Sequence, residues 1–351
     1  MNDDIPAPWH LTAPPFGEIE EAAERIRGVL VETPLLESER LNARLGGRLL
    51  VKAEGLQRTG SFKARGAWNR LSLLSAEERA RGVVAFSSGN HAQAVAWAGR
   101  RLGIGTVVIA MPADAPVAKI ERTRFWGAEI VLYDRSTEDR EAVGRRLATE
   151  RGLILVPPYD DRRVIAGAGT LGLEVARQAK AMEAAPDAFL VCCAGGGLTA
   201  GCALALETLL PATQVFAVEP EGFDDTTRSL TAGVRLRNAP GATSICDAVL
   251  APMPGALTFS INAPRLGGGL VVRDVEALKA MRVAFEEFGL VAEPGGAVAF
   301  AAALSGRLPV KGQTVAVALT GANVDPGTYQ RAFRDCIPST TPRAPQTETI
   351  R

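Results

Sequence analysis

The chain has 351 residues, the length of about two domains, and 47% of them are hydrophobic, so a full apolar core can form. Lysine plus arginine and aspartate plus glutamate number 39 each, so no net charge draws the chain toward nucleic acid or an anionic membrane. This balance argues against both of those partners and leaves a small molecule as the expected one.

The N-terminal segment "MNDDIPAPWH" is acidic and contains prolines, so it lacks the basic and apolar regions of a secretion signal. No later stretch has the ~18 uninterrupted apolar residues of a membrane span. We therefore expect a cytoplasmic protein. The next segment, residues 17–30, places apolar residues on one helical face and predicts a helix that ends before Pro34.

Short apolar runs alternate with helical patterns along most of the remaining chain. The runs that predict buried strands are 47–54, 82–88, 106–112, 129–134, 153–158, 188–194, 214–220 and 314–321. Strands that alternate with helices are typical of parallel sheets covered on both faces. We predict an α/β fold with two parallel-sheet domains of three layers each.

Five cysteines are present, and none has the spacing of a metal site. The adjacent pair Cys192 and Cys193 lies in the apolar run 188–194. We interpret both as core residues of a protein from a reducing compartment.

Ligands of parallel sheets bind beyond the carboxyl ends of the strands, and three loops there contain candidate residues. In the first, "SSGNH" at 87–91 precedes a helix whose free N–H groups can hold a carboxylate, although a plain polar cap would look the same. In the second, Gly195 to Gly197 let the backbone approach an oxyanion and cradle a phosphate. The third loop starts with a hydroxyl, Thr320, beside Gly321.

The second loop also fits a dinucleotide-binding pattern. Gly195, Gly197 and Ala200 match G-x-G-x-x-G/A, and Glu219 ends the next strand, near where a ribose-binding acid should lie. A nicotinamide-dependent oxidoreductase is therefore an alternative. It leaves the motif "TGSFKARG" at 59–66 and the loop at 87–91 without a role.

Several motifs occur together in one order along the chain. They are "VKAEGLQRTGSFKARGAWN", "SSGNHAQAVA", "VIAGAGTLGLEV", "AGGGLTAG", "VEP" followed by "DD", "AEPGGAVA" and "LTGANVD". In order and approximate spacing they resemble the pyridoxal-phosphate enzymes of fold type II, which share a tryptophan synthase β-like fold. The similarity covers about residues 17–330 and is greatest to the threonine and serine dehydratases, serine racemase and hydroxyaspartate dehydratase.

The resemblance implies a pyridoxal 5′-phosphate site with a role for each matching residue. Lys63 matches the lysine that forms the Schiff base and then abstracts the α-proton of the substrate, and Thr320 matches the hydroxyl that faces the pyridine nitrogen. Ala194 departs from a family pattern that often has four glycines. The implied cofactor-binding residues are Phe62, Lys63, Asn90, Ala194, Gly195, Gly196, Gly197, Leu198, Glu293 and Thr320.

The resemblance also implies a substrate site. Ser88 is the second implied catalytic residue, because the matching serine of the racemase protonates the opposite face of the α-carbon. Tyr159 stands where dehydratases have an aromatic residue, which favours dehydration. Arg140 aligns approximately with a racemase arginine near the substrate, with an exposed helical position as the alternative. The implied substrate-binding residues are Ser87, Ser88, Gly89, Asn90, His91, Arg140 and Tyr159.

The segment "EPEGFDD" resembles the divalent cation site of the family. Glu219 and Asp225 would supply carboxylates and Phe223 its backbone carbonyl, and oxygen ligands suit Mg²⁺ or Ca²⁺. A solvated acidic loop is the alternative.

Taken together, these features predict a large cofactor-binding domain at 1–81 and 159–339, a small domain at 82–158 that closes over the substrate, and a disordered tail at 340–351. The predicted activity is that of a dehydratase, an ammonia-lyase that converts a 3-hydroxy amino acid such as L-threonine or L-serine to a 2-oxo acid and ammonia. Hydroxyaspartate dehydratase and serine racemase are the alternatives within the family. A homodimer is the common state of the family and is expected here.

Overall fold

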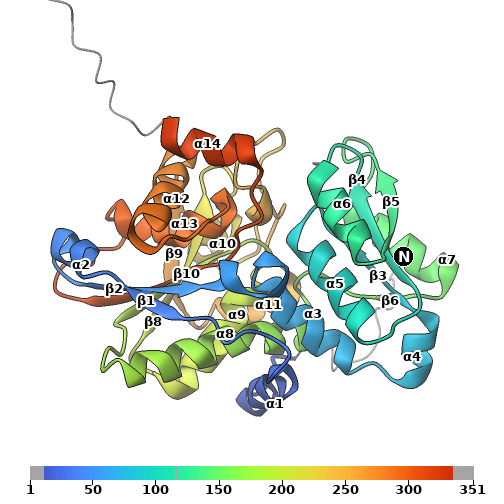
Figure 1. Cartoon of the computed structure of the whole chain (residues 1–351), viewed down its shortest axis with the longest axis horizontal. Coiled ribbons are helices and arrows are strands. Elements are labelled where there is room, and N and C mark those ends of the chain that lie inside the picture. The colour runs from blue at the N-terminus through green and yellow to red at the C-terminus, as the bar shows by residue number, and fades with distance from the viewer. Residues whose placement is uncertain (1–11, 116, 335–351) are drawn as a thin grey trace, which may run out of the picture.

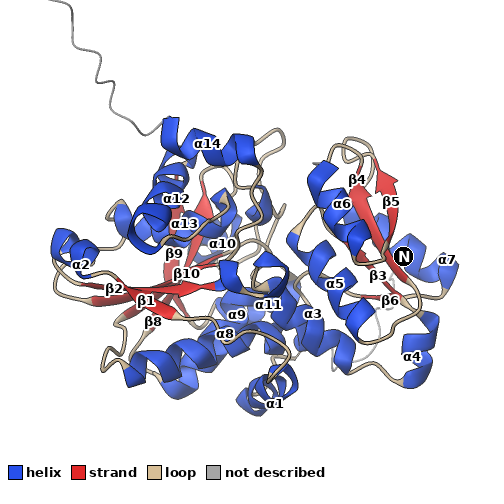
Figure 2. Cartoon of the chain, in the orientation of Figure 1, coloured by secondary structure: helices blue, strands red, loops and turns tan. Residues whose placement is uncertain are grey.

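Two sheets, each surrounded by helices, organise the chain (Figure 1). The computed structural model describes residues 12–115 and 117–334, so the predicted tail at 340–351 lies outside the described residues. Figure 2 shows the two groups of strands as separate bodies of secondary structure. No helix in the described part of the chain is long and apolar enough to cross a membrane.

The larger sheet has six strands. They are β1 (Leu35–Glu37), β2 (Arg48–Ala53), β7 (Ala188–Cys192), β8 (Gln214–Pro220), β9 (Leu266–Val272) and β10 (Thr314–Leu319). Their order is β1-β2-β10-β7-β8-β9, and all neighbours pair in parallel except β1 with β2. The central strands β7 and β10 are buried along nearly their whole length, as their continuous apolar sequences predict.

Helices cover both faces of the larger sheet. α13 packs against β10, β7 and β8 with α12 outside it, while α9 and α8 lie on the opposite face (Figure 1). The helices of this part are α1 (Phe16–Ile26), α2 (Glu39–Leu45), α8 (Arg162–Ala181), α9 (Gly197–Leu209), α10 (Asp225–Ala232), α11 (Ala256–Asn262), α12 (Asp274–Phe288), α13 (Pro294–Leu304) and α14 (Pro326–Arg334). Short 3₁₀ turns are η2 (Glu54–Leu56), η3 (Arg58–Gly60) and η4 (Asp247–Val249).

The smaller sheet has the order β5-β4-β3-β6, and its strands are all parallel. Its elements are α4 (Ala76–Arg81), β3 (Val83–Phe86), α5 (Asn90–Arg101), β4 (Val107–Pro112), α6 (Val117–Phe125), β5 (Glu129–Tyr133), α7 (Arg140–Arg151) and β6 (Ile154–Leu155). Successive residues of β3 face opposite sides, so Val83 and Ala85 join one apolar core while Val84 and Phe86 join another. Both faces of this sheet are therefore covered.

The predicted α/β class is confirmed, but several expectations about the elements were wrong. The larger sheet is mixed, because the edge strand β1 runs antiparallel to β2. The strands β1 and β9 were missed; β1 is only three residues long, and the sequence of β9, "LGGGLVV", contains three glycines, which disfavour strands. β5 is an edge strand with Leu132 half exposed rather than a buried strand. The helix predicted over 17–30 ends at Ile26, because the chain turns at Gly28 with φ 71°.

All four strands of the smaller sheet fall inside the predicted small domain, and its boundaries at 82 and 158 remain a prediction. The helix α3 (Lys63–Ser72) lies between the two sheets, since it packs against α8 on one side and α5 on the other. Its apolar residues Ala64, Ala67 and Leu71 belong to the core of the smaller sheet. The first residue of α3 is therefore held by both halves of the molecule.

A buried ion network anchors the face of α3 that lies away from the smaller sheet. The Arg65 guanidinium donates to both carboxylate oxygens of Glu54, at 2.7 and 2.8 Å, and to both of Glu174, at the same distances. Lys52 donates to Glu174 at 2.6 Å, and Arg65, Lys52 and Glu54 have no exposed surface. Burial opposes the ionisation of Glu54, but the adjacent Arg65 holds its pKa below the ordinary value. The network pairs each buried charge with an opposite one.

We expect replacement of Arg65 by methionine to destabilise the protein by about 3–5 kcal/mol, because it leaves two carboxylates buried without their main partner. Denaturant unfolding followed by circular dichroism measures the change. The control is Arg177→Met, which removes an exposed pair with Glu32 and should cost less than about 1 kcal/mol. Equal destabilisation by the two substitutions would contradict the role given to the network.

Candidate active site

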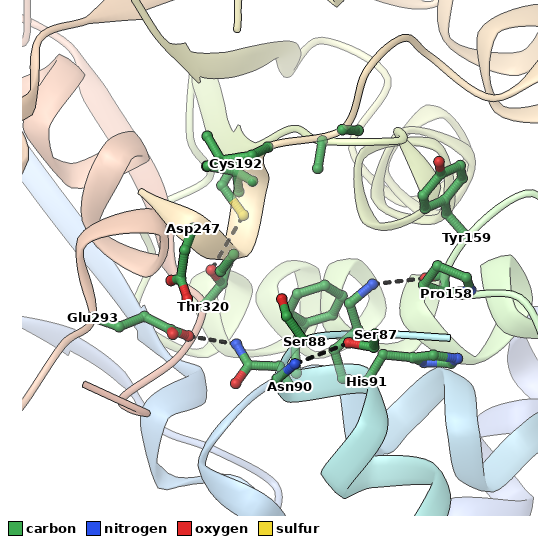
Figure 3. A pocket seen from close by; sticks show the side chains of 18 of the residues that line it. Ser87, Ser88, Asn90, His91, Pro158, Tyr159, Cys192, Asp247, Glu293 and Thr320 are labelled. Carbon is green, nitrogen blue, oxygen red and sulfur yellow. Dashed lines mark hydrogen bonds between the residues drawn. The ribbon is translucent and has the colours of Figure 1, made fainter. Parts of the chain in front are cut away.

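A cavity lies between the two sheets, where strands from both end (Figure 3). A concave site lined by aromatic side chains and a few polar groups is typical of small-molecule binding. Most of the predicted site residues line it, namely Phe62, Lys63, Ser87, Ser88, Gly89, Asn90, His91, Arg140, Tyr159, Ala194, Glu293 and Thr320. Loops at the carboxyl ends of the parallel strands of both sheets therefore meet at one place, as the position of ligands in parallel sheets predicts.

Lys63 is the first residue of α3, and its side chain enters the cavity. Its amine donates to the Pro158 carbonyl at 2.7 Å and lies 5.1 Å from the centre of the Phe62 ring. Burial lowers the pKa of Lys63 to about 8, and the positive charge of Arg140 contributes to the lowering. About a tenth of this amine is therefore neutral at pH 7, far more than for an ordinary lysine, and the neutral form is the one that a nucleophile or a general base requires.

The motif before Lys63 folds tightly against the end of β10. Thr59 and Gly60 both take left-handed conformations, with φ 59° and 74°. The turn lets the Phe62 N–H donate to the Thr320 carbonyl at 3.1 Å. This bond ties the lysine to the strand end that presents the Thr320 hydroxyl. A left-handed non-glycine residue such as Thr59 costs about 1–3 kcal/mol and is typical of functional sites.

Thr320 presents its hydroxyl beside a thiol. Its Oγ1 lies 3.2 Å from the Sγ of Cys192, which ends the neighbouring strand β7 (Figure 3). Burial raises the pKa of the Cys192 thiol to about 11, so the thiol keeps its proton. Cys192 is buried, as the core interpretation predicts, but it also lines the cavity, which that interpretation did not anticipate.

A chain of amides and one carboxylate forms the opposite wall. Asn90 donates to the Glu293 carboxylate at 2.5 Å (Figure 3). Asn90 also accepts from the Asn323 amide, at 2.7 Å. Burial, together with the negative charge of Asp247, raises the pKa of Glu293 to about 7. The second oxygen of Glu293 is buried and has no hydrogen-bond partner among the described residues. An orphaned polar atom of this kind fits a site that is completed by a ligand.

The glycine loop lies directly behind Ala194, which lines the cavity. Gly196 takes a left-handed conformation with φ 91°, and Gly197 begins α9, a helix of 13 residues. The Tyr159 ring packs on Gly195, where any Cβ would collide with it. Backbone N–H groups at the start of a helix favour an anion, so the loop fits a phosphate. Leu198, also implied as a cofactor residue, is buried in α9.

The serine loop connects β3 to α5. The Gly89 N–H donates to the Ser87 hydroxyl at 3.1 Å, and Ser88 lines the cavity. His91 is buried, with its Nε2 2.9 Å from the Val156 carbonyl, and burial lowers its pKa to about 3. The neutral ring therefore donates its Nε2 proton to the Val156 carbonyl. This bond leaves Nε2 unable to contact a ligand.

Two cations from the smaller sheet face the cavity. Arg140 is the first residue of α7, and its guanidinium opposes the rise that burial causes in the pKa of the Tyr159 phenol. Of the two interpretations of Arg140, the position near the site is the one observed. Lys119 of α6 forms an ion pair with Asp247 of η4, across the cavity from its own sheet. Neither Lys119 nor Asp247 was anticipated, because no motif marks them and only the fold brings them together.

The implied cation ligands lie outside this cavity. Glu219 accepts from the backbone N–H groups of Thr226 at 2.9 Å and Thr227 at 2.7 Å, so it caps the start of α10. Asp225 accepts from the Asn238 amide, and its second oxygen is buried without a partner in the described chain. Burial raises the pKa of Glu219 to about 8 and that of Asp225 to about 6. Within residues 12–115 and 117–334, no cluster of three or more His, Cys, Asp or Glu residues is suited to a metal.

Comparison with known proteins identifies the family. A family model described as "Pyridoxal-phosphate dependent enzyme" matches residues 26–321, most of the chain. The chain belongs to the pyridoxal-phosphate dependent enzymes. The resemblance to this family is thereby confirmed. The oxidoreductase alternative is set aside, because the match to the pyridoxal-phosphate family includes both the glycine loop and the lysine motif.

Several relatives of this pyridoxal-phosphate enzyme are similar over nearly their full length. The L-threo-3-hydroxyaspartate ammonia-lyase of Saccharomyces cerevisiae is 41% identical over 91% of this chain and 96% of its own. The serine racemase of Schizosaccharomyces pombe is 36% identical over 90% of this chain and 96% of its own length. The crystal structure of a T.th. threonine deaminase superposes with a TM-score of 0.82 at 44% identity, covering 89% of this chain and 99% of that one.

The lowered pKa of Lys63 predicts how the cofactor-free enzyme takes up pyridoxal phosphate. The neutral amine is the reactive form, so the rate of uptake should rise with pH and level off above about pH 8. Stopped-flow absorbance over a pH series from below to well above that value measures this rate. A rate that keeps rising into the range where an ordinary lysine titrates, about pH 10, would contradict the effect of burial.

Proposed function

We propose that this pyridoxal-phosphate enzyme is an ammonia-lyase, a dehydratase that converts a 3-hydroxy amino acid such as L-threonine or L-serine to a 2-oxo acid and ammonia. The observation that carries the proposal is the pairing of Lys63 with Thr320 in one cavity, a depressed-pKa amine and a neutral hydroxyl tied through the Phe62 backbone. The relatives named above, an ammonia-lyase and a deaminase among them, support it.

The residues that fit pyridoxal phosphate come from four segments. Lys63 would bond it covalently, and Gly195 to Gly197 at the start of α9 would hold its phosphate. Asn90 would donate to its ring oxygen, and Thr320 would meet its pyridine nitrogen. Two structural features fit such a group. One oxygen of Glu293 is buried without a partner among the described residues, and the glycine loop has no room for a Cβ at Gly195 or Gly196. The cofactor supplies the electron sink for the negative charge at the α-carbon.

The hydroxyl of Thr320 would make the cofactor a mild acceptor of electrons. Thr320 cannot protonate the pyridine nitrogen as a carboxylic acid would, and the protonated thiol of Cys192 can donate to its oxygen. The hydroxyl proton is then free to point at the ring. With this partner the cofactor would supply only mild electron withdrawal, which suits elimination of a β-hydroxyl.

The protein groups divide the remaining work between them. The Ser88 N–H and the N–H groups of the first turn of α5 would hold the substrate carboxylate. The Ser87 and Gly89 N–H groups already donate to the Ala110 carbonyl and to the Ser87 hydroxyl. Lys63 Nζ, once the substrate has replaced it on the cofactor, would take the α-proton, and the Pro158 carbonyl, which accepts from it at 2.7 Å, would orient the free amine. Ser88 would be the proton donor on the opposite face, which gives a racemase side activity.

The expected outcome for the purified enzyme is release of a 2-oxo acid and ammonia from at least one of L-serine, L-threonine and the 3-hydroxyaspartate diastereomers. Ser88→Ala should retain most of this release while losing any formation of the opposite enantiomer. Coupled keto-acid assays and chiral chromatography measure the two. Cofactor binding with no keto acid from any of these substrates would contradict the proposed activity.

Within the proposed activity, 3-hydroxyaspartate is the second candidate substrate. Arg140 and Lys119 place two cations on the cavity wall, and Arg140 can pair with a carboxylate beyond the β-carbon. The ammonia-lyase from Saccharomyces cerevisiae is named for that amino acid, which supports the choice.

If Arg140 binds a distal carboxylate, Arg140→Met should lower kcat/KM for 3-hydroxyaspartate by about tenfold or more and affect L-serine much less. Steady-state kinetics on the two substrates tests this. The matched control is Arg145→Met, which removes an exposed arginine of the same helix that pairs with Glu141. A parallel loss on both substrates would assign Arg140 to the common reaction instead.

We further propose that Glu219, Asp225 and the Phe223 carbonyl bind Mg²⁺ or Ca²⁺. Two buried carboxylates with raised pKa values and an orphaned oxygen on Asp225 support a cation there. The bonds from Glu219 to α10 count against a full ligand set. Homodimer formation and a cytoplasmic location also remain predictions.

For the cation, the pH dependence has a definite sign. Both carboxyl groups have folded-state pKa values above their unfolded values. Without a cation, stability therefore falls as pH rises from about 4, where the unfolded groups titrate, to about 8, the higher of the two folded-state pKa values. A bound cation removes this loss, so Mg²⁺ or Ca²⁺ should raise the melting temperature more at about pH 8 than at about pH 5.5. Asp225→Asn should abolish the gain, and Asp224→Asn, at the preceding position, should keep it. No cation-dependent shift in the wild type would contradict the site.

A further inference from the structure

The carbonyl groups of the glycine loop are held by α11, a helix that no motif connects with it. The Thr258 hydroxyl donates to the Gly195 carbonyl, and the Asn262 amide donates to the Gly196 carbonyl at 3.2 Å. The Gly255 N–H also donates to the Gly195 carbonyl, at 3.2 Å. Thr258 and Asn262 are almost completely buried. Two buried side chains thus direct their donors to two consecutive peptide groups of one loop.

Fixing a carbonyl also fixes the N–H of the same peptide group. In a trans peptide the C=O and N–H point in opposite directions. With the Gly195 and Gly196 carbonyls held toward α11, the N–H groups of Gly196 and Gly197 face away from α11. These two groups lie at the start of α9, where N–H groups have no partner within the helix. They are the donors that a phosphate on the loop would use.

The loop is enclosed on both sides by named contacts. On one side the Tyr159 ring packs against Gly195, and on the other a Cβ at Gly196 would come within 2.8 Å of the Asn262 amide and 3.1 Å of Thr258. Asp160, next to Tyr159, accepts from the N–H groups of Ala256 and Thr258 at 3.0 Å each. The segment that carries Tyr159 therefore also anchors α11.

We infer that Thr258 and Asn262 are positioning residues for phosphate, which set the affinity of this enzyme for the phosphate group of its cofactor by holding the glycine loop in its binding conformation. The inference rests on the proposed use of the loop as the phosphate cradle. It predicts an effect confined to the phosphate. Pyridoxal, which lacks that group, would use the remaining contacts of the site and would not depend on the direction of the loop N–H groups.

The experiment compares pyridoxal phosphate with pyridoxal on cofactor-free, full-length protein, using absorbance titration to obtain Kd. Thr258→Val and Asn262→Leu remove the donors while keeping similar volume. Each should raise the Kd for pyridoxal phosphate about fivefold or more, the value of one lost hydrogen bond, and leave the Kd for pyridoxal within about twofold. Thr258→Ser keeps the hydroxyl and should restore the wild-type ratio of the two Kd values, which also covers the case in which the valine variant folds poorly.

Thr123→Val is the matched control, since Thr123 is equally buried and donates only within α6, to the Lys119 carbonyl. It should leave the ratio unchanged. Equal weakening of both compounds by Thr258→Val and Asn262→Leu, or no weakening of either, would overturn the inference while the proposed function survives. A wild type that binds the two compounds equally well would instead refute the phosphate cradle itself, and the inference with it.

Discussion

The burial of one amine is the constraint on which the rest of the structure depends. Lys63 Nζ sits at the start of α3, and the desolvation that brings its pKa to about 8 exists only because two sheets close around it. A lysine at the protein surface would stay charged and could neither bond a carbonyl compound nor take a proton. The fold therefore creates the reactivity that the motif "TGSFKARG" only permits.

The elements that contact α3 hold the Lys63 amine in place. Arg65, two residues further along, is locked between Glu54 and Glu174, while the opposite face of α3 packs on the core of the smaller sheet. The Phe62 N–H bonds the Thr320 carbonyl, so the lysine and the hydroxyl across from it share one support. Relative motion of the sheets would reach the cavity through α3 and through the Lys119–Asp247 pair.

The features that could be predicted are those that depend on residues close together in the sequence. Lys63, Asn90 and Thr320 were found because each follows a strand or opens a helix within a motif, and the central strands because their apolar runs are continuous. Glu219 was interpreted as a cation ligand from its motif, and that role stays a prediction. Its bonds to the start of α10 were not anticipated, because they depend on the angle between β8 and that helix. The glycine-rich β9 gave no strand signal, because its place is set by pairing with β8 rather than by propensity.

Other parts of the site could not be predicted because they join distant segments. The Cys192 thiol meets Thr320 only because β7 and β10 are neighbours in the sheet, although 128 residues separate them. Thr258 and Asn262 reach the glycine loop from 63 and 66 residues away, and nothing in the sequence of α11 marks it as a partner. These contacts are properties of the packing rather than of any motif.

The central claim is that Lys63 alone is the covalent partner of pyridoxal phosphate. The most direct measurement is borohydride reduction of the loaded enzyme, followed by proteolysis and mass spectrometry of the labelled peptide. We expect the reduced cofactor on the peptide that contains Lys63 and on no other. A label on another lysine, such as Lys119 at the same cavity, or no label at all on a protein that binds the cofactor, would contradict the claim.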